Sequence, residues 1–204
     1  MVVRWLIVGV WAALLAARVI VVSVHPDADL TGFGIAEGAA IAGGLCVIGF
    51  AVLRARSLRR RHADDALARA IRGVDPTVWI VPAAPTPELR EAVAAVRPET
   101  ELRSRVTWAF GATEASLWEL DGRRATRLLI IRWSRVMHVG LEDLPDPSGR
   151  GTACAVALHH VRFDDTTAVA TFFVRAAAGS DRLLRRGQRL DDLLARLARE
   201  RIIA

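Results

Sequence analysis

Residues 33–61 read FGIAEGAAIAGGLCVIGFAVL and then RARSLRRR, so that an apolar run with a single charge, Glu37, ends directly in five arginines. The apolar part has about the 20 residues that a helix needs to cross a hydrocarbon core about 30 Å thick. A similar run, Trp5–Val24, precedes it across the short turn His25–Gly32. The two runs predict a transmembrane hairpin of two helices at residues 1–53.

Basic residues are distributed unevenly around the two apolar runs. The turn between the runs contains two aspartates and no arginine. The opposite ends carry Arg4 and a basic cluster that consists of Arg54, Arg56, Arg59, Arg60 and Arg61. Because cytoplasmic flanks of membrane helices are enriched in basic residues, this asymmetry predicts a multi-pass protein of the inner (cytoplasmic) membrane with both termini in the cytoplasm. The same cluster is expected to attract anionic lipid headgroups without specificity, by about 1 kcal/mol per basic residue.

A cleaved signal peptide is the alternative interpretation of the first run. Arg18 interrupts its apolar stretch, and no small-x-small cleavage site follows Val24. Both features argue against cleavage, so we expect the first run to remain as a membrane span.

Two charges lie within the predicted hairpin. Arg18 is near the outer end of the first helix and Glu37 is near the outer end of the second. At 1.5 Å per residue both lie about 6 to 9 Å below the outer surface, which predicts either an interhelical ion pair or two side chains that snorkel separately. A proton or ion relay would need further polar residues along the path, and the deeper parts of both runs have none.

Small residues recur at four-residue spacing in the second run. Gly34 and Gly38 form a Gly-x-x-x-Gly motif, and Ala39 with Gly43 repeats the spacing. Such a face lets two helix backbones approach closely in lipid. The partner is either the first helix or a second copy of the chain, so homo-oligomerisation is an open alternative.

The charge balance differs between the two parts of the chain. All 28 basic residues are arginine; residues 1–62 carry a net charge of +4, whereas residues 63–204 carry +2. A nucleic-acid-binding domain would concentrate an unbalanced basic face on its folded part. Here arginine is interleaved with aspartate and glutamate, so no binding of nucleic acid is expected.

Residues 54–103 are predicted to form a basic juxtamembrane helix and a linker. The second helix has no glycine or proline from Arg54 to Arg72 and is expected to stop at Gly73. Beyond it, Thr77–Val81 has the β-branched and aromatic composition of a strand, and Pro87–Val96 reads as a short helix with proline at its first position. We interpret this segment as a lead-in to the domain that follows.

A third region, residues 104–204, changes to the two-residue period of β-strands. Turns at Gly111 and at Asp121-Gly122 separate three predicted antiparallel strands, and three more are expected between Arg135 and Arg175. An amphipathic helix is predicted for Asp181–Arg201, with Ser180 as its N-cap and one leucine-rich face. The sequence therefore predicts an α+β protein: an antiparallel β-barrel or sandwich closed by a C-terminal helix and preceded by a membrane hairpin.

This region resembles the pleckstrin-homology-like (PH-like) superfamily, in its bacterial membrane-anchored form with two transmembrane helices. The resemblance rests on the order of elements, on the GATEASLW hairpin that begins at Gly111, and on Ile131–Val139, IRWSRVMHV, read as a strand pair. It implies a binding or scaffolding module rather than an enzyme. The first hairpin turn, Ala109–Thr113, lacks the basic residues of lipid-binding members, so no specific headgroup site is expected there.

No pattern in the sequence identifies a catalytic, cofactor or metal site. His159 and His160 are adjacent on a predicted strand and would point to opposite faces, which disfavours a shared metal ion. Ser116, Ser134 and Cys154 have no base partner that spacing identifies. We therefore predict a non-enzymatic, membrane-tethered interaction module that holds an unknown protein partner. The alternative is an accessory subunit or a small enzyme of a transport or envelope-synthesis complex.

Overall fold

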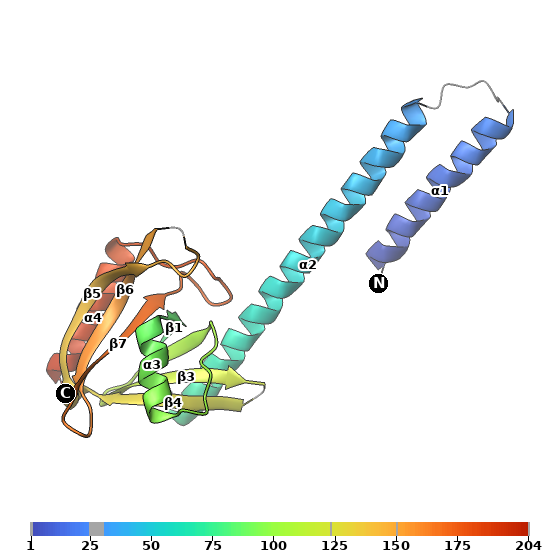
Figure 1. Ribbon diagram of the computed structural model, residues 1–204. Helices are drawn as coiled ribbons and strands as arrows, with labels where there is room; N and C mark the ends of the chain where they lie inside the picture. The colour runs from blue at the N-terminus through green and yellow to red at the C-terminus, as the bar shows by residue number, and fades with distance from the viewer. Residues whose placement is uncertain (1, 25–30, 123, 150, 204) are drawn as a thin grey trace. The chain divides into compact units, whose positions relative to one another are not determined.

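The chain forms two compact units, residues 1–56 and residues 57–204. The computed structural model describes residues 2–24, 31–122, 124–149 and 151–203 (Figure 1). The boundary between the units falls within one long helix, α2 (Thr31–Val74), whose last part belongs to the second unit.

The N-terminal unit consists of helix α1 (Val2–Val24) and the first part of α2. Both predicted apolar runs are therefore helical. Among the described residues, Ile41–Val74 is a stretch long and apolar enough to cross a membrane, whereas the apolar stretch Trp11–Val21 is shorter. Helix α2 ends at Val74, where Gly73 and the following Pro76 were expected to stop it.

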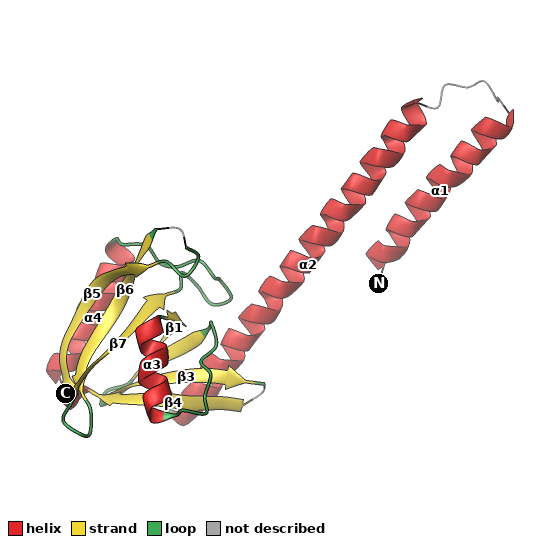
Figure 2. Ribbon diagram, viewed as in Figure 1, coloured by secondary structure: helices red, strands yellow, loops and turns green. Residues whose placement is uncertain are grey.

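The second unit is built on one antiparallel sheet, which confirms the α+β class (Figure 2). Seven strands lie in the described part of the chain, in the order β4-β3-β2-β1-β7-β6-β5. Strands β4 and β5 are the two edges, and the sheet is open between them. The strands are β1 (Trp79–Pro85), β2 (Val106–Phe110), β3 (Glu114–Asp121), β4 (Arg124–Arg132), β5 (Val136–Pro145), β6 (Thr152–Val161) and β7 (Thr167–Val174).

Short turns connect β2 to β3, at the predicted Gly111, and β6 to β7. At the β2–β3 turn, the Gly111 amide donates to the Glu114 carbonyl at 2.9 Å. At the β6–β7 turn, Asp165 adopts a left-handed conformation with φ 61°, and the Asp164 carboxylate accepts hydrogen bonds from the Thr166 amide and hydroxyl. An aspartate that bonds two residues onward is a common turn device, and it shapes the loop before β7.

Strand β1 differs most from the expected organisation. It pairs with β2 through Trp79↔Phe110 and with β7 through Ala83↔Val174, so it lies in the middle of the sheet. The segment interpreted as a linker thus supplies a central strand. The strand accommodates its prolines: Pro82 is paired with Thr107 of β2, and Pro85 is paired with Phe172 of β7.

Helix α3 (Pro87–Val96) connects β1 to the rest of the sheet and forms where the sequence predicted it. The Thr86 hydroxyl caps it by accepting a hydrogen bond from the Leu89 amide at 3.1 Å. Leu89 and Val93 are buried in the main core, and the helix contacts β7, β1 and β4. This placement puts α3 next to the free edge of β4.

Aromatic side chains dominate the core of the sheet unit. The rings of Trp108 and Phe172 lie 5.1 Å apart, and those of Phe110 and Trp133 lie 6.0 Å apart. Trp133 also donates from Nε1 to the Gly111 carbonyl at 2.7 Å. Tilted and offset ring contacts of this kind stabilise a core beyond the burial of apolar area alone.

The C-terminal helix α4 (Gln188–Ile203) begins later than predicted, and Ser180 is not its N-cap. Residues 181–187 instead continue along β7: Leu183 pairs with Arg175, and the Leu184 amide donates to the Val174 carbonyl at 2.7 Å. Three of the predicted leucines of the helical face are buried in the main core, namely Leu190, Leu193 and Leu197.

The last turns of α2 belong to the sheet unit. Leu67 and Ile71 are buried in a small cluster with Ala109 and Trp118. The structure therefore divides the chain at residue 56 rather than at residues 53 and 103. The physical reason is that both β1 and the end of α2 bury apolar side chains on the sheet, so neither can act as a linker.

Candidate functional site: an arginine groove and an aspartate cluster

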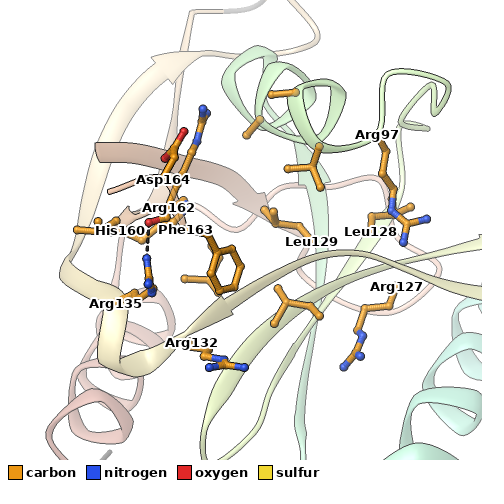
Figure 3. A pocket seen from close by; sticks show the side chains of 16 residues that line it. Arg97, Arg127, Leu128, Leu129, Arg132, Arg135, His160, Arg162, Phe163 and Asp164 are labelled. Atoms are coloured by element: carbon orange, nitrogen blue, oxygen red, sulfur yellow. Dashed lines mark hydrogen bonds between the residues drawn. The ribbon is translucent and has the colours of Figure 1, made fainter. Parts of the chain in front are cut away.

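A groove of about 590 Å³ opens beside the edge strand β4 (Figure 3). Its walls are the C-terminal half of α3, residues 127–132 of β4, the end of the 3-10 turn η1 (Trp133–Arg135), and residues 160–164 at the β6–β7 turn. The volume lies within the range of about 300 to 1,000 Å³ that is usual for ligand sites. We call this cavity the arginine groove.

Five arginines line the groove and give it a positive charge. They face a single lining carboxylate, Asp164, which is already engaged by Thr166. The lining arginines are Arg97, Arg127, Arg132, Arg135 and Arg162. In Figure 3, Arg135 and Arg162 lie on one side of the groove, and Arg97 and Arg127 lie on the other.

Two of these arginines have partners within the protein. Arg127 pairs with Glu114 at 2.9 Å, and Arg135 lies 3.7 Å from Asp165 and donates to the Arg162 carbonyl. The other three have no carboxylate within 4.0 Å in the described part of the chain; these are Arg97, Arg132 and Arg162. Since guanidinium groups bind carboxylates in a bidentate fork, these three are suited to an acidic ligand.

The floor of the groove is apolar. Leu128, Leu129 and Ile131 are buried, whereas Val96, Ile130 and Phe163 are exposed although they are hydrophobic. Phe163 is 72% exposed and projects into the groove, with the Arg135 guanidinium 4.9 Å from its ring centre. Hydrophobic side chains that remain exposed around one cavity mark an interaction surface.

His160 stands at the wall of the groove and is nearly fully buried. Burial lowers the pKa of its imidazole, and the nearby charge of Arg162 acts in the same direction. Its Nδ1 lies 3.2 Å from the Leu158 carbonyl. The ring is therefore neutral at pH 7, and the positive charge of the groove comes from its arginines.

A second group of charges fastens α2 to the sheet. One carboxylate oxygen of Asp64 accepts from Arg105 at 2.8 Å, from Arg175 at 2.9 Å and from the Gly179 amide at 2.7 Å. Arg105 also pairs with Asp181 at 2.6 Å. We call Asp64, Arg105, Arg175 and Asp181 the Asp64 cluster.

The Asp64–Arg175 ion pair within the Asp64 cluster is charge-compensated and has little access to solvent. The side chains of Asp64 and Arg175 are 11% and 2% exposed. Burial alone would raise the pKa of the Asp64 carboxyl, but hydrogen bonds from Arg175 and Gly179, together with the charges of Arg175 and Arg105, hold that pKa below its usual value. Arg175 also donates from Nε to the Ala83 carbonyl at 3.0 Å, so the cluster joins α2, β1 and β7.

The predicted lipid-contacting arginines lie on α2 and are exposed. Arg54 and Arg56 belong to the N-terminal unit, whereas Arg59, Arg60 and Arg61 belong to the sheet unit, which begins at Ser57. Arg60 pairs with Asp181, and Arg61 contacts Gly179. Two of the five therefore touch the protein itself, and contact of the cluster with anionic lipid stays a prediction.

The residues predicted to act within the membrane are only partly described. Arg18, Glu37 and Gly34 lie on α1 and α2, but their side chains fall outside the described residues. A Cβ added at Gly38 or Gly43 would meet no described atom within 4 Å. Close packing at these glycines, with the first helix or with a second copy, therefore stays a prediction.

The two histidines considered for metal binding have separate environments. His160 is buried, whereas Nε2 of His159 lies 3.2 Å from Glu142 and its ring is 5.8 Å from that of His138. Within the described residues, no group of three or more His, Cys, Asp or Glu side chains is arranged to hold a metal ion.

Neither charged site could be predicted from the sequence. The groove arginines are spread over residues 97–162 and look like ordinary interleaved charges until the sheet brings them together. One local signal was present: Phe163 is an aromatic residue in the polar turn VRFDDTT, and a side chain in such a turn is not easily buried. Arg175 directly follows strand β7, and nothing in the nearby sequence indicates its pairing with Asp64, 111 residues earlier.

Comparison with known proteins gives no family assignment. A scan against protein-family models finds no match, and a search of curated protein sequences finds no relative.

Proposed function

We propose that this chain is a non-enzymatic, membrane-tethered interaction module that holds a protein partner at the inner face of a bacterial membrane. The single observation that carries the proposal is the arginine groove, in which three arginines with no carboxylate within 4.0 Å among the described residues lie beside exposed apolar side chains. Exposed hydrophobic surface combined with uncompensated charge is the usual composition of a docking site.

The domain is proposed to be PH-like. The support is that the described strands form one antiparallel sheet and that an amphipathic helix follows the last strand, as the resemblance implies, although α3 intervenes between β1 and β2. The buried leucines of α4, and its contacts with β5 and η1, support a helix that closes one end of the curled sheet. The proposed domain is longer than the sequence suggested, because it begins before β1.

The composition of the groove favours binding over catalysis. Its titratable side chains other than arginine are His160 and Asp164. The imidazole is buried beside the Leu158 carbonyl, and the carboxylate is held by Thr166. Both groups already make hydrogen bonds within the protein, and the described lining of the groove has no other side chain suited to act as a general acid or base.

The anchor is proposed to be a two-helix hairpin with both ends in the cytoplasm. The support is the apolar stretch in α2, the helical state of the first run and the asymmetry of the arginines. An alkaline phosphatase fused after Ala204 should be inactive, and a fluorescent protein fused there should fluoresce. The opposite pattern would place the domain outside and overturn the proposed location.

Site-specific photo-crosslinking of the full chain in living bacteria tests the docking function. A photoreactive amino acid at Ile130, which lines the groove and is 37% exposed, should yield an adduct of one defined mass. Met137 is the matched control, because it is 44% exposed and does not line the groove. Equal adducts at both positions, or none at Ile130, would contradict the proposal.

A further inference from the structure

We propose that the arginine groove binds an extended acidic segment of the partner protein, which adds to the sheet as a new strand along β4. This inference rests on the proposed function and names the class of ligand. It is drawn from three independent features of the groove: an open strand edge, exposed apolar side chains and unpaired arginines.

The open edge is the first feature. Strand β4 is last in the strand order, and within the part of the chain that the structure describes it pairs only with β3, through residues such as Leu117↔Leu129 and Glu114↔Arg132. Its other side faces the groove, which six consecutive residues of the strand, 127–132, help to line. Edge strands carry backbone donors and acceptors that an extended peptide can pair with, and the side chains of that peptide then enter adjacent pockets.

The second feature is the distribution of apolar side chains. The sheet unit has six exposed large hydrophobic residues in its described part, and three of them line this groove: Val96, Ile130 and Phe163. They come from α3, β4 and the β6–β7 turn, so they surround the space beside the strand edge. An added strand with apolar residues at alternate positions would cover them, because alternate side chains of a strand share one face.

Charge complementarity identifies the remaining side chains of the ligand. Arg97, Arg132 and Arg162 line the groove with no carboxylate within 4.0 Å among the described residues. The single lining carboxylate, Asp164, accepts hydrogen bonds from Thr166 and offsets part of the charge of Arg162 alone, so the groove keeps a net positive charge. An acidic peptide would neutralise them, and a basic peptide would be repelled. A length of about six residues matches the lining stretch of β4, at about 3.3 Å per residue.

Binding of a defined peptide to the full-length protein in detergent micelles tests the inference. The probe is an acetylated and amidated octapeptide in which glutamate alternates with valine or leucine, carrying a fluorophore for anisotropy. We expect saturable binding that weakens as salt is raised. The same peptide with lysine in place of glutamate should not bind.

A second probe separates strand addition from simple charge attraction. Methylation of alternate backbone nitrogens on one edge of the octapeptide removes the donors that would face β4, while all side chains stay the same. The affinity should fall at least about tenfold, because several backbone hydrogen bonds are lost at once. Equal affinity of both peptides would overturn the strand-addition model.

Charge-reversal variants locate the site. Arg132→Glu and Arg162→Glu change exposed groove residues, and each should weaken peptide binding about tenfold or more. Arg189→Glu on α4 is the matched control, because it reverses an exposed arginine that does not line the groove. Equal losses in all three variants would show that net charge, rather than the groove, determines binding.

Two further outcomes would replace the inferred ligand. Vesicles of phosphatidylglycerol that displace the octapeptide, and that lose affinity for Arg132→Glu, would assign the groove to anionic lipid. Light scattering that shows a dimer converted to a monomer by Arg132→Glu would assign it to a second copy. If crosslinks form at Ile130 while the octapeptide does not bind, the docking function stands and the acidic-strand inference fails.

Discussion

The arginines of the Asp64 cluster and those of the arginine groove lie in two different electrostatic environments. In the cluster, Arg105 and Arg175 are 20% and 2% exposed and each contacts the Asp64 carboxylate within 3 Å. In the groove, three arginines have no such partner in the described part of the chain: Arg97, Arg132 and Arg162. An arginine whose charge is compensated joins two parts of the fold, whereas one that is not compensated is available to a ligand.

The largest effect is expected from removing the segment that the Asp64 cluster fastens. A fragment of residues 57–204 should fold, and a fragment of residues 104–204 should not, because the latter lacks the central strand β1 and the apolar end of α2. Circular dichroism and thermal unfolding of the two fragments provide the measurement. Cooperative unfolding of the shorter fragment would show that β1 and α2 are dispensable.

The same segment shows what the sequence could and could not predict. The helix at Pro87–Val96 was predictable because Thr86 and Pro87 are local signals, and the strands after residue 104 were predictable from alternation and turn residues. The position of β1 was not, because its pairing with β7 joins residues about 90 positions apart and leaves no local pattern. Residues 181–187 were mistaken for helix because Leu183 and Leu184 fit a helical face equally well.

The charged sites were hidden for a related reason. The groove arginines are spread along the sequence from residue 97 to residue 162, and only the arrangement of α3, β4 and the β6–β7 turn brings them together. Asp64 gave no local signal of its role, because its partner Arg175 is distant in sequence. Propensity and periodicity describe neighbours in the chain, whereas charge compensation depends on neighbours in space.

The Asp64→Asn substitution should produce the next largest effect. It leaves the buried Arg175 without its counter-charge, and breaking a buried ion pair from one side costs about 3 kcal/mol. Urea unfolding of the 57–204 fragment measures the loss. Asp181→Asn is the control, because its side chain is 57% exposed and its loss should cost less than about 1 kcal/mol. Equal losses would refute the distinction between a buried and an exposed partner.

A glycine substitution tests how closely α2 approaches the loop after β7. Gly179 has φ +77°, and a Cβ there would lie 3.1 Å from the backbone nitrogen of Arg61. Gly179→Ala should therefore cost more than the roughly 1 to 2 kcal/mol of left-handed strain alone. Gly122→Ala carries the strain without the contact, since Gly122 has φ +60° and no described atom within 4 Å of its added Cβ. Equal melting temperatures of the two variants would contradict the close approach.

A smaller effect of pH on stability should distinguish His160, in the wall of the groove, from Asp64 in the cluster. The pKa of His160 is lowered by burial, so the unfolded chain binds its proton first, and stability should fall as the pH drops below the ordinary value of 6.5. Asp64, whose pKa is also lowered, affects stability only in the acid range below its ordinary value of 3.8. In the His160→Gln variant, the free energy of unfolding should depend less steeply on pH between pH 6.5 and 5. An unchanged slope would assign the loss to another group.

Hydrogen exchange of the full-length protein, with and without the acidic octapeptide, is the most direct test of the central claim that the unpaired arginines mark a strand-binding edge. Pairing with a new strand protects backbone amides from exchange. We expect slower exchange in β4, residues 124–132, and no change around Asp64 or Arg175. Protection at the opposite edge, β5, or no protection at β4 despite bound peptide, would contradict it.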